Sequence, residues 1–212
     1  NIKKVDKASN GKIGYIYIPD MGPEGLNEFS RYFYPQLDKE GLIIDDRANG
    51  GGNVSPMILE RLSREPYRLT MRRGSARIGT VPDAVQVGPK VCLINKYSAS
   101  DGDLFPWGFR ALGLGKLIGT RTWGGIVGIS GSLPYMDGTD IRVPFFTSFD
   151  PKTGSWIIEN HGVDPDILID NDPVKEWNGE DQQLDRAIQE VMKELQNRKP
   201  LPGVPTPRDF SK

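Results

Sequence analysis

Short apolar runs alternate along the chain with longer stretches in which apolar residues recur every three or four positions. The runs have the length of buried strands, and they occupy residues 13–18, 42–44, 90–95 and 116–119. The periodic stretches are typical of helices with one buried face, and they cover residues 23–39, 56–63, 98–112 and 180–196. Because strands and helices alternate, the pattern predicts an α/β fold with mainly parallel strands packed by helices.

Other segments lack this alternation. Residues 67–73 form a charged, β-like stretch, and the glycine-rich residues 122–149 predict hairpins or a covering β-layer. We expect residues 1–12 to be a linker from an upstream domain and the Pro-rich tail, residues 198–212, to be extended or docked on a neighbour. The whole of 1–212 is predicted to be a single domain, and the lack of an initiator methionine indicates a fragment of a longer protein.

Composition removes several classes of function. The net charge is −1, from 27 basic and 28 acidic residues, which gives no basic field for nucleic acid. No apolar run approaches the roughly 20 residues that span a bilayer. One cysteine and one histidine exclude an internal disulfide and make a zinc site improbable, so no metal or cofactor is expected. Cys92 lies in an apolar run and is predicted to be buried, which permits a cytoplasmic location.

The first candidate for chemistry is Ser100, which lies where a buried strand passes into a helix. A turn at this point projects the hydroxyl out of the sheet and leaves the next backbone N–H groups free for an anion. Such donors are what a tetrahedral oxyanion needs. The pattern Ser100-x-x-Asp103 is equally typical of a helix N-cap, so this segment alone leaves both interpretations open.

The second candidate is the run Gly50-Gly51-Gly52, which also follows a buried strand. Consecutive glycines let the backbone approach a ligand and turn N–H groups toward it. A phosphate-binding loop would need a Gly-Lys-Ser/Thr sequence, which does not follow. A plain tight turn remains the alternative.

Together, Asp45-Asp46-Arg47-Ala48-Asn49-Gly50-Gly51-Gly52 and Tyr97-Ser98-Ala99-Ser100-Asp101-Gly102-Asp103 resemble the tricorn branch of the C-terminal-processing serine peptidases. The resemblance continues in the same order through residues 115–119, 121–125 and 159–166, and it covers the chain from about Gly11 to Leu195. It implies a crotonase/Clp-like spiral sandwich.

The resemblance also implies roles for individual residues. Ser100 would be the nucleophile, and the N–H of Asp101 would form the oxyanion hole with that of Gly52, or as second choice Gly51. Glu159 would orient and polarise the base.

The base itself is the point at which the chain departs from the family. The tricorn-type histidine lies upstream in a separate domain, and the one histidine here is His161. If residues 159–161 form a strand, Glu159 and His161 share a face, and a local triad with Ser100 becomes conceivable. A Ser–Lys pair would need Lys116, which is a poor candidate.

We therefore expect the core of a serine peptidase that hydrolyses oligopeptides through an acyl-enzyme and is incomplete without its upstream histidine. The alternatives are a catalytically silent peptide-binding module and a crotonase-like acyl-CoA enzyme. An α/β-hydrolase is disfavoured because no Gly-x-Ser-x-Gly occurs. Expected partners are a peptide substrate, further copies of the chain in a homo-oligomer and its upstream domains.

The acidic residues of the two motifs form a group that could in principle hold a metal. Their spacing matches no oxygen-ligand loop. We expect surface or capping roles for Asp45, Asp46, Asp101 and Asp103.

Overall fold

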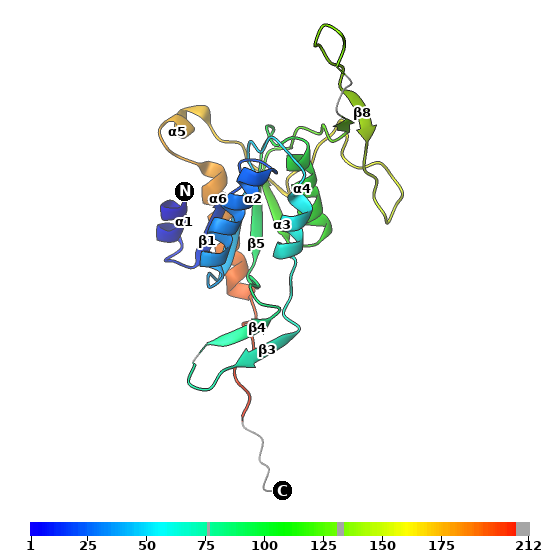
Figure 1. Ribbon diagram of the computed structural model, residues 1–212. Coiled ribbons are helices and arrows are strands. Elements are labelled where there is room, and N and C mark those ends of the chain that lie inside the picture. Colours follow the sequence, from blue (N-terminus) through cyan, green and yellow to red (C-terminus); the bar gives the residue numbers. More distant parts are fainter. Residues whose placement is uncertain (76, 131–133, 207–212) are drawn as a thin grey trace.

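A parallel sheet of five strands forms the centre of the molecule (Figure 1). The computed structural model describes residues 1–75, 77–130 and 134–206. In spatial order the strands are β1 (Ile13–Tyr17), β2 (Gly41–Asp45), β5 (Lys90–Ile94), β6 (Gly115–Gly119) and β9 (Ile167–Leu168). Every neighbouring pair is parallel, so the expected α/β class with a parallel sheet packed by helices is confirmed.

Helices cover both faces of this sheet. One face carries α2 (Pro23–Phe33), α3 (Ser55–Leu62) and α4 (Asp101–Ala111), which lie in front of the strands in Figure 1. The other face carries α1 (Ile2–Ala8) and α6 (Gln182–Asn197). A 3₁₀ turn, η1 (Tyr34–Gln36), extends α2, and the short helix α5 (Pro173–Trp177) precedes α6.

The two helical layers explain why the strands are apolar on both sides. In β2, Leu42 and Ile44 point into the cluster beneath α2, α3 and α4, whereas Ile43 points into the cluster beneath α1 and α6. Side chains alternate along a strand, so a sheet covered on both faces needs an unbroken apolar run. That requirement is what made the strands recognisable in the sequence.

Two hairpins project from this body (Figure 1). Strands β3 (Arg68–Met71) and β4 (Ile78–Val81) form one, and β7 (Gly128–Ser130) and β8 (Val143–Phe146) form the other. The hairpins predicted within 122–149 are thus present, although residues 131–133 lie outside the described part. In the Pro-rich tail, residues 202–205 line a pocket together with β3 and β4, and residues 207–212 are not described.

Some expected boundaries differ. Residues 2–8, expected as part of a linker, form helix α1, and its Val5 is fully buried in the core. The helix predicted over 23–39 ends at Phe33, because Pro35 has no N–H to continue the ladder. In the described part of the chain, no helix is long and apolar enough to cross a bilayer.

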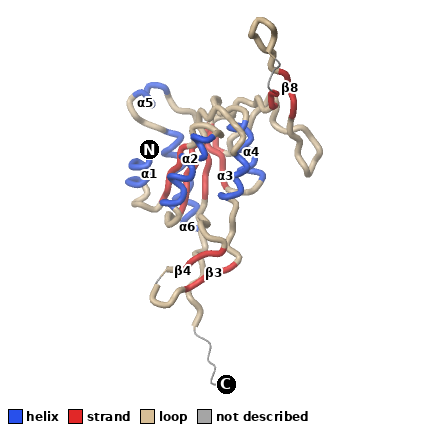
Figure 2. The backbone as a smooth tube through the Cα atoms, viewed as in Figure 1, coloured by secondary structure: helices blue, strands red, loops and turns tan. Residues whose placement is uncertain are grey.

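The carboxyl ends of the parallel strands meet at one edge of the sheet, where Figure 2 shows loops gathered above the strands. At this edge β2 passes into residues 46–52, and β5 passes into residues 95–100. Loops at this edge are where α/β sheets place their ligands. Both sequence candidates therefore lie at the same edge.

Candidate active site

Ser100 is the residue immediately before α4, and its backbone conformation is unusual. It has φ +58° and ψ −119°, a region that residues with a side chain rarely adopt. Such strain costs about 1–3 kcal/mol and is typical of functional sites. The turn before it is fixed by Ser98, whose Oγ donates to the carbonyl of Asp46 at 2.8 Å. Ser100 itself is partly exposed, so its hydroxyl is available to an incoming molecule.

The glycine loop lies directly against this turn. A Cβ atom on Gly51 would fall 2.7 Å from the Cβ of Ser100 and 3.1 Å from the amide nitrogen of Asp101. On Gly52 it would fall 2.0 Å from the carbonyl oxygen of Met21. No side chain fits at either position, and both glycines have positive φ. Close approach to the serine turn on one side and to Met21 on the other is the reason for glycine here.

Gly50, Gly52 and Asp101 each have an N–H group that makes no hydrogen bond within the described residues. The Gly51 amide is occupied, because it donates to Oδ1 of Asn49 at 2.9 Å. Among the described residues no acceptor takes the amide of Gly52 or that of Asp101. The Asp101 side chain is engaged elsewhere, since it accepts from the backbone amide and the hydroxyl of Ser55 at the start of α3.

Glu159 is connected to the serine turn through residues 122–127. Its Oε2 accepts the amides of Ile126 and Val127 at 2.7 and 2.9 Å. The same segment is held to the serine turn by the bond from the Trp123 amide to the carbonyl of Ser98 at 3.0 Å. The carboxylate is half-buried and makes no hydrogen bond with Ser100 in the described structure.

His161 does not complete a local triad. Residues 158–161 form a turn rather than a strand, with the amide of His161 bonded to the carbonyl of Ile158, so the premise of a shared strand face is wrong. The ring instead contacts Asp164, with Nε2 2.7 Å from Oδ2, and it is 54% exposed. This contact, followed by that of Arg121, lowers the pKa of Asp164. His161 stabilises its own turn and is not placed as a base.

Lys116 is also committed elsewhere. Its Nζ pairs with Glu190 on α6 and lies 3.5 Å from Glu194. These contacts raise its pKa and so favour the charged form, which cannot accept a proton. The dismissal of a Ser–Lys pair agrees with these contacts.

The acidic residues of the two motifs are buried, so the expected surface roles are wrong. Asp45, Asp46, Asp101 and Asp103 are at most 5% exposed. A capping role holds for Asp101, which binds the first amide of α3, while Asp103 accepts the amide of Gly124 at 2.8 Å. Within the described residues, no cluster of acidic, histidine and cysteine side chains has the arrangement of a metal site.

Asp46 is exceptional within this group. It is fully buried, and neither carboxyl oxygen has a hydrogen-bond partner of normal geometry in the described part of the chain. Burial raises its pKa well above the ordinary value, and the carboxylates of Asp45, Asp103 and Asp101 raise it further, against a smaller opposing effect of Asn49. Folding therefore favours the protonated form of Asp46 relative to the unfolded chain.

Replacing Asp46 with asparagine is expected to stabilise the protein increasingly as pH rises. The folded-state pKa lies above the unfolded value of about 3.9, so wild-type stability falls with pH between these two values. The variant lacks this loss, so its Tm relative to that of wild type should rise between about pH 4 and about pH 8. Thermal unfolding at a series of pH values measures this. The exposed Asp83→Asn serves as control, and a constant difference across pH would contradict the argument.

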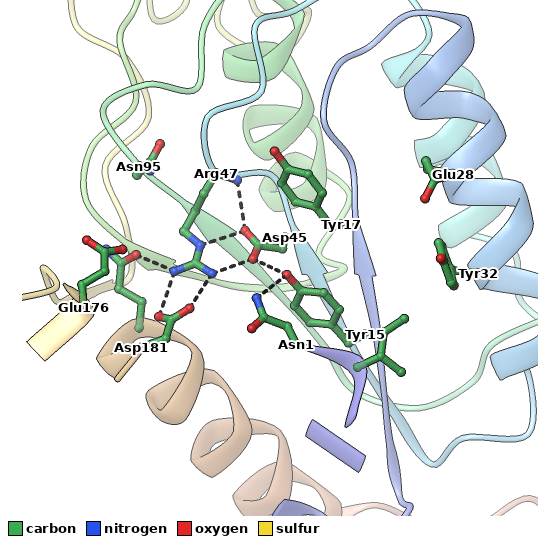
Figure 3. Close-up of a pocket in the computed structure, with 12 residues that line it drawn as sticks. Asn1, Tyr15, Tyr17, Glu28, Tyr32, Asp45, Arg47, Asn95, Glu176 and Asp181 are labelled. Atoms are coloured by element: carbon green, nitrogen blue, oxygen red, sulfur yellow. Dashed lines mark hydrogen bonds and ion pairs between the residues drawn. The ribbon is translucent and has the colours of Figure 1, made fainter. Parts of the chain in front are cut away.

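Arg47 joins the glycine loop to a distant helix (Figure 3). Its Nε and Nη2 bind Asp45 at 2.8 and 2.6 Å, and Nη1 and Nη2 bind Asp181 at 2.9 and 2.8 Å. Nη1 also donates to Gln183 at 3.0 Å, which uses all five N–H groups of the guanidinium. Tyr15 adds a hydroxyl bond to Asp45 at 2.6 Å. These residues line a pocket of about 580 Å³.

This cluster was not foreseen from the sequence. The pattern Asp-x-Arg before the glycines was visible, but nothing local indicates that Asp181, which lies 134 residues after Arg47, is its partner. As the N-cap of α6, Asp181 also accepts the amide of Leu184. The cluster therefore fixes the beginning of the glycine loop to the beginning of α6.

The chain is similar to known proteins in both sequence and structure. The tricorn protease of Thermoplasma volcanium is 45% identical over 202 residues, which cover 94% of this chain and 19% of that protein. For the tricorn protease of Thermoplasma acidophilum the identity is 44% over 198 residues, covering 93% and 18%. A crystal structure of the tricorn protease superimposes with a TM-score of 0.87 at 44% identity, over 93% of this chain and 19% of that one.

The chain thus spans about a fifth of the length of the relatives it matches. The family model with the description Peptidase family S41 matches residues 12–169, a segment that includes both strand-end loops, Ser100 and Glu159. This match covers well over half of the chain and confirms the resemblance drawn from the motifs. The chain belongs to peptidase family S41.

Proposed function

We propose that this chain is the catalytic core of a serine peptidase that cleaves oligopeptides through an acyl-enzyme, with Ser100 as nucleophile. The observation that carries the proposal is the strained turn at Ser100, against which the backbone of Gly51 lies. Two further observations support it: Ser100 is partly exposed, and the amides of Gly52 and Asp101 have no acceptor among the described residues.

In this mechanism Ser100 Oγ attacks the scissile carbonyl carbon, and the carbonyl oxygen becomes an oxyanion. The N–H groups of Gly52 and Asp101 donate to that oxygen and stabilise the charge as it develops. Collapse of the intermediate breaks the C–N bond, releases the amine fragment and leaves an ester on Ser100, which water then hydrolyses. Glu159 holds the base, while its own position is fixed by the amides of Ile126 and Val127.

The proton acceptor is proposed to come from outside this chain. A serine hydroxyl is a weak nucleophile at neutral pH and needs a base within hydrogen-bond reach. His161 is bound to Asp164, and Lys116 is bound to Glu190 and Glu194. The relatives are about five times longer than this chain, which supports a histidine supplied by an upstream domain of the same protein.

The proposal is tested by assaying oligopeptide hydrolysis with the chain alone and with the longer protein that includes the region upstream of it. General-base assistance contributes about 10²- to 10⁴-fold, so the chain alone is expected to be no more active than its own Ser100→Ala variant. The longer protein is expected to be active. His161→Ala should leave that activity unchanged, because the ring stabilises only its own turn.

Robust turnover by the chain alone that is lost in His161→Ala would show a complete local triad and contradict the upstream base. The alternative function is that of a catalytically silent peptide-binding module. In that case the longer protein, too, would neither hydrolyse peptides nor react with an active-site serine probe. Membership of a peptidase family speaks against the acyl-CoA enzyme.

We further propose that the protein acts in the cytoplasm as a homo-oligomer. Support comes from the arm formed by β7, β8 and the loop that follows them up to Trp156, which projects from the rest of the molecule in Figure 1. Several large apolar side chains on it are exposed, among them Phe145 at 76%, Trp156 at 72% and Phe149 at 61%. Phe149 and Trp156 also contact each other edge to face, and exposed apolar side chains that cluster usually mark a contact with another protein surface.

A further inference from the structure

Asn49 connects three segments that build the candidate oxyanion hole. It is fully buried, and its side-chain Nδ2 donates to the carbonyl of Ile18, just after β1, at 3.1 Å. Its backbone carbonyl accepts the amide of Ala99, beside the nucleophile, at 2.8 Å. Its Oδ1 accepts the amide of Gly51 at 2.9 Å. One residue thus holds the end of β1, the serine turn and the glycine loop together.

A separate hydrogen bond orients the neighbouring amide of Gly52. The carbonyl of Gly51 accepts the amide of Met21 at 2.8 Å, so the Gly51–Gly52 peptide plane is fixed with its oxygen toward Met21. In a trans peptide the N–H points opposite to the C=O. The Gly52 N–H therefore points away from Met21. The glycine loop lies between Met21 and Ser100, so the Gly52 N–H points to the side of the loop that faces Ser100.

We propose that Asn49 is a positioning residue that selects the Gly52 amide as oxyanion donor by occupying the amide of Gly51. Without Asn49 Oδ1, the Gly50–Gly51 peptide plane that carries the Gly51 N–H is free to turn. The adjoining Gly51–Gly52 plane, which the bond from Met21 orients, then loses the fixed neighbour on its N-terminal side. The proposal rests on the proposed function, because it concerns the oxyanion hole of the same serine. It predicts a defect in binding the transition state rather than the substrate.

The test uses the longer, active protein with Asn49→Ala. We expect kcat to fall by about 10- to 10³-fold, up to the loss typical of removing one oxyanion donor, while KM changes little. Affinity for a peptide aldehyde, whose Ser100 adduct places an oxygen in the oxyanion hole, should weaken by a similar factor. Affinity for the unreactive peptide of the same sequence, measured on the Ser100→Ala background, should stay within about twofold.

The matched control is Asn95→Ala. Asn95 is also an asparagine at a strand end of this edge, and its Oδ1 accepts the amides of Ala48 and Tyr97 rather than that of a glycine. We expect this variant to lose stability yet keep kcat per folded molecule. A second variant, Asn49→Asp, keeps the acceptor for Gly51 but places a carboxylate oxygen against the Ile18 carbonyl. The activity of Asn49→Asp relative to wild type should improve as pH falls. A protonated carboxyl can donate a hydrogen bond to the Ile18 carbonyl, as the Asn49 amide does.

The outcomes separate the two proposals. If Ser100→Ala leaves peptide hydrolysis intact, the proposed function fails. If hydrolysis depends on Ser100 but Asn49→Ala keeps both kcat and aldehyde affinity per folded molecule, the role of Asn49 fails alone. An equal loss in Asn95→Ala and Asn49→Ala would reduce Asn49 to a structural residue and would also overturn the inference.

Discussion

Replacing Ser100 with alanine in the longer protein is expected to lower kcat for oligopeptide hydrolysis by about 10⁶-fold, the loss typical of removing a serine nucleophile. The hydroxyl supplies the only bond to the acyl group in the proposed mechanism, so no neighbouring residue can replace it. What remains is the residual catalysis of an oxyanion hole and binding site, about 10³- to 10⁴-fold over water. Single-turnover kinetics with a chromogenic peptide measure the effect.

Ser100→Gly provides a control that separates activity from stability. It should be as inactive as the alanine variant, but its Tm is not expected to fall, because glycine adopts φ +58° without the strain that a side chain incurs. Retention of more than about a tenth of wild-type kcat by Ser100→Ala would remove Ser100 from the mechanism, since general-base effects alone exceed that factor.

Replacing Arg47 with alanine is expected to give the largest loss of stability, about 3–5 kcal/mol, since it removes one partner of a largely buried ion cluster. The side chains of Arg47, Asp45 and Asp181 are 12%, 3% and 18% exposed. Without the guanidinium, Asp45 keeps only the Tyr15 hydroxyl and its own turn as partners, and Asp181 loses two charged hydrogen bonds. At about 2–4 °C per kcal/mol for a chain of this size, Tm should fall by roughly 10 °C.

An exposed ion pair supplies the comparison. Arg64 binds Glu60 one helical turn away, and Arg64→Ala should cost no more than about 0.5 kcal/mol. Arg47→Lys should fall between the two, because an ammonium cannot bind two carboxylates in the forked geometry of a guanidinium. Chemical denaturation of the three variants tests the order. A loss below about 1 kcal/mol for Arg47→Ala, the range of surface pairs, would show that the cluster does not hold the glycine loop to α6.

The sequence by itself determined the layered α/β fold. Residues 42–44 and 90–95 read as strands because a sheet covered on both faces imposes an unbroken apolar run, and residues 180–196 read as a helix because one face repeats every three to four positions. Helix α1 was not predicted, because Val5 is its one buried residue and a single buried position gives no periodicity. The family and the two strand-end loops were also recognisable, because their signals are local runs of residues.

Only the tertiary structure decided how the site is assembled. The carboxylates of both motifs are buried rather than exposed, His161 contacts Asp164 instead of Glu159, and the Gly51 amide is occupied while that of Gly52 is free. Each of these depends on a contact across a turn or between segments far apart in the chain, as Arg47 and Asp181 are. The periodicity of apolar residues indicates which face of a helix or strand is buried. The partner of a single hydrogen bond depends instead on how the helices and strands pack. Such a partner therefore cannot be read from the pattern of apolar and polar residues.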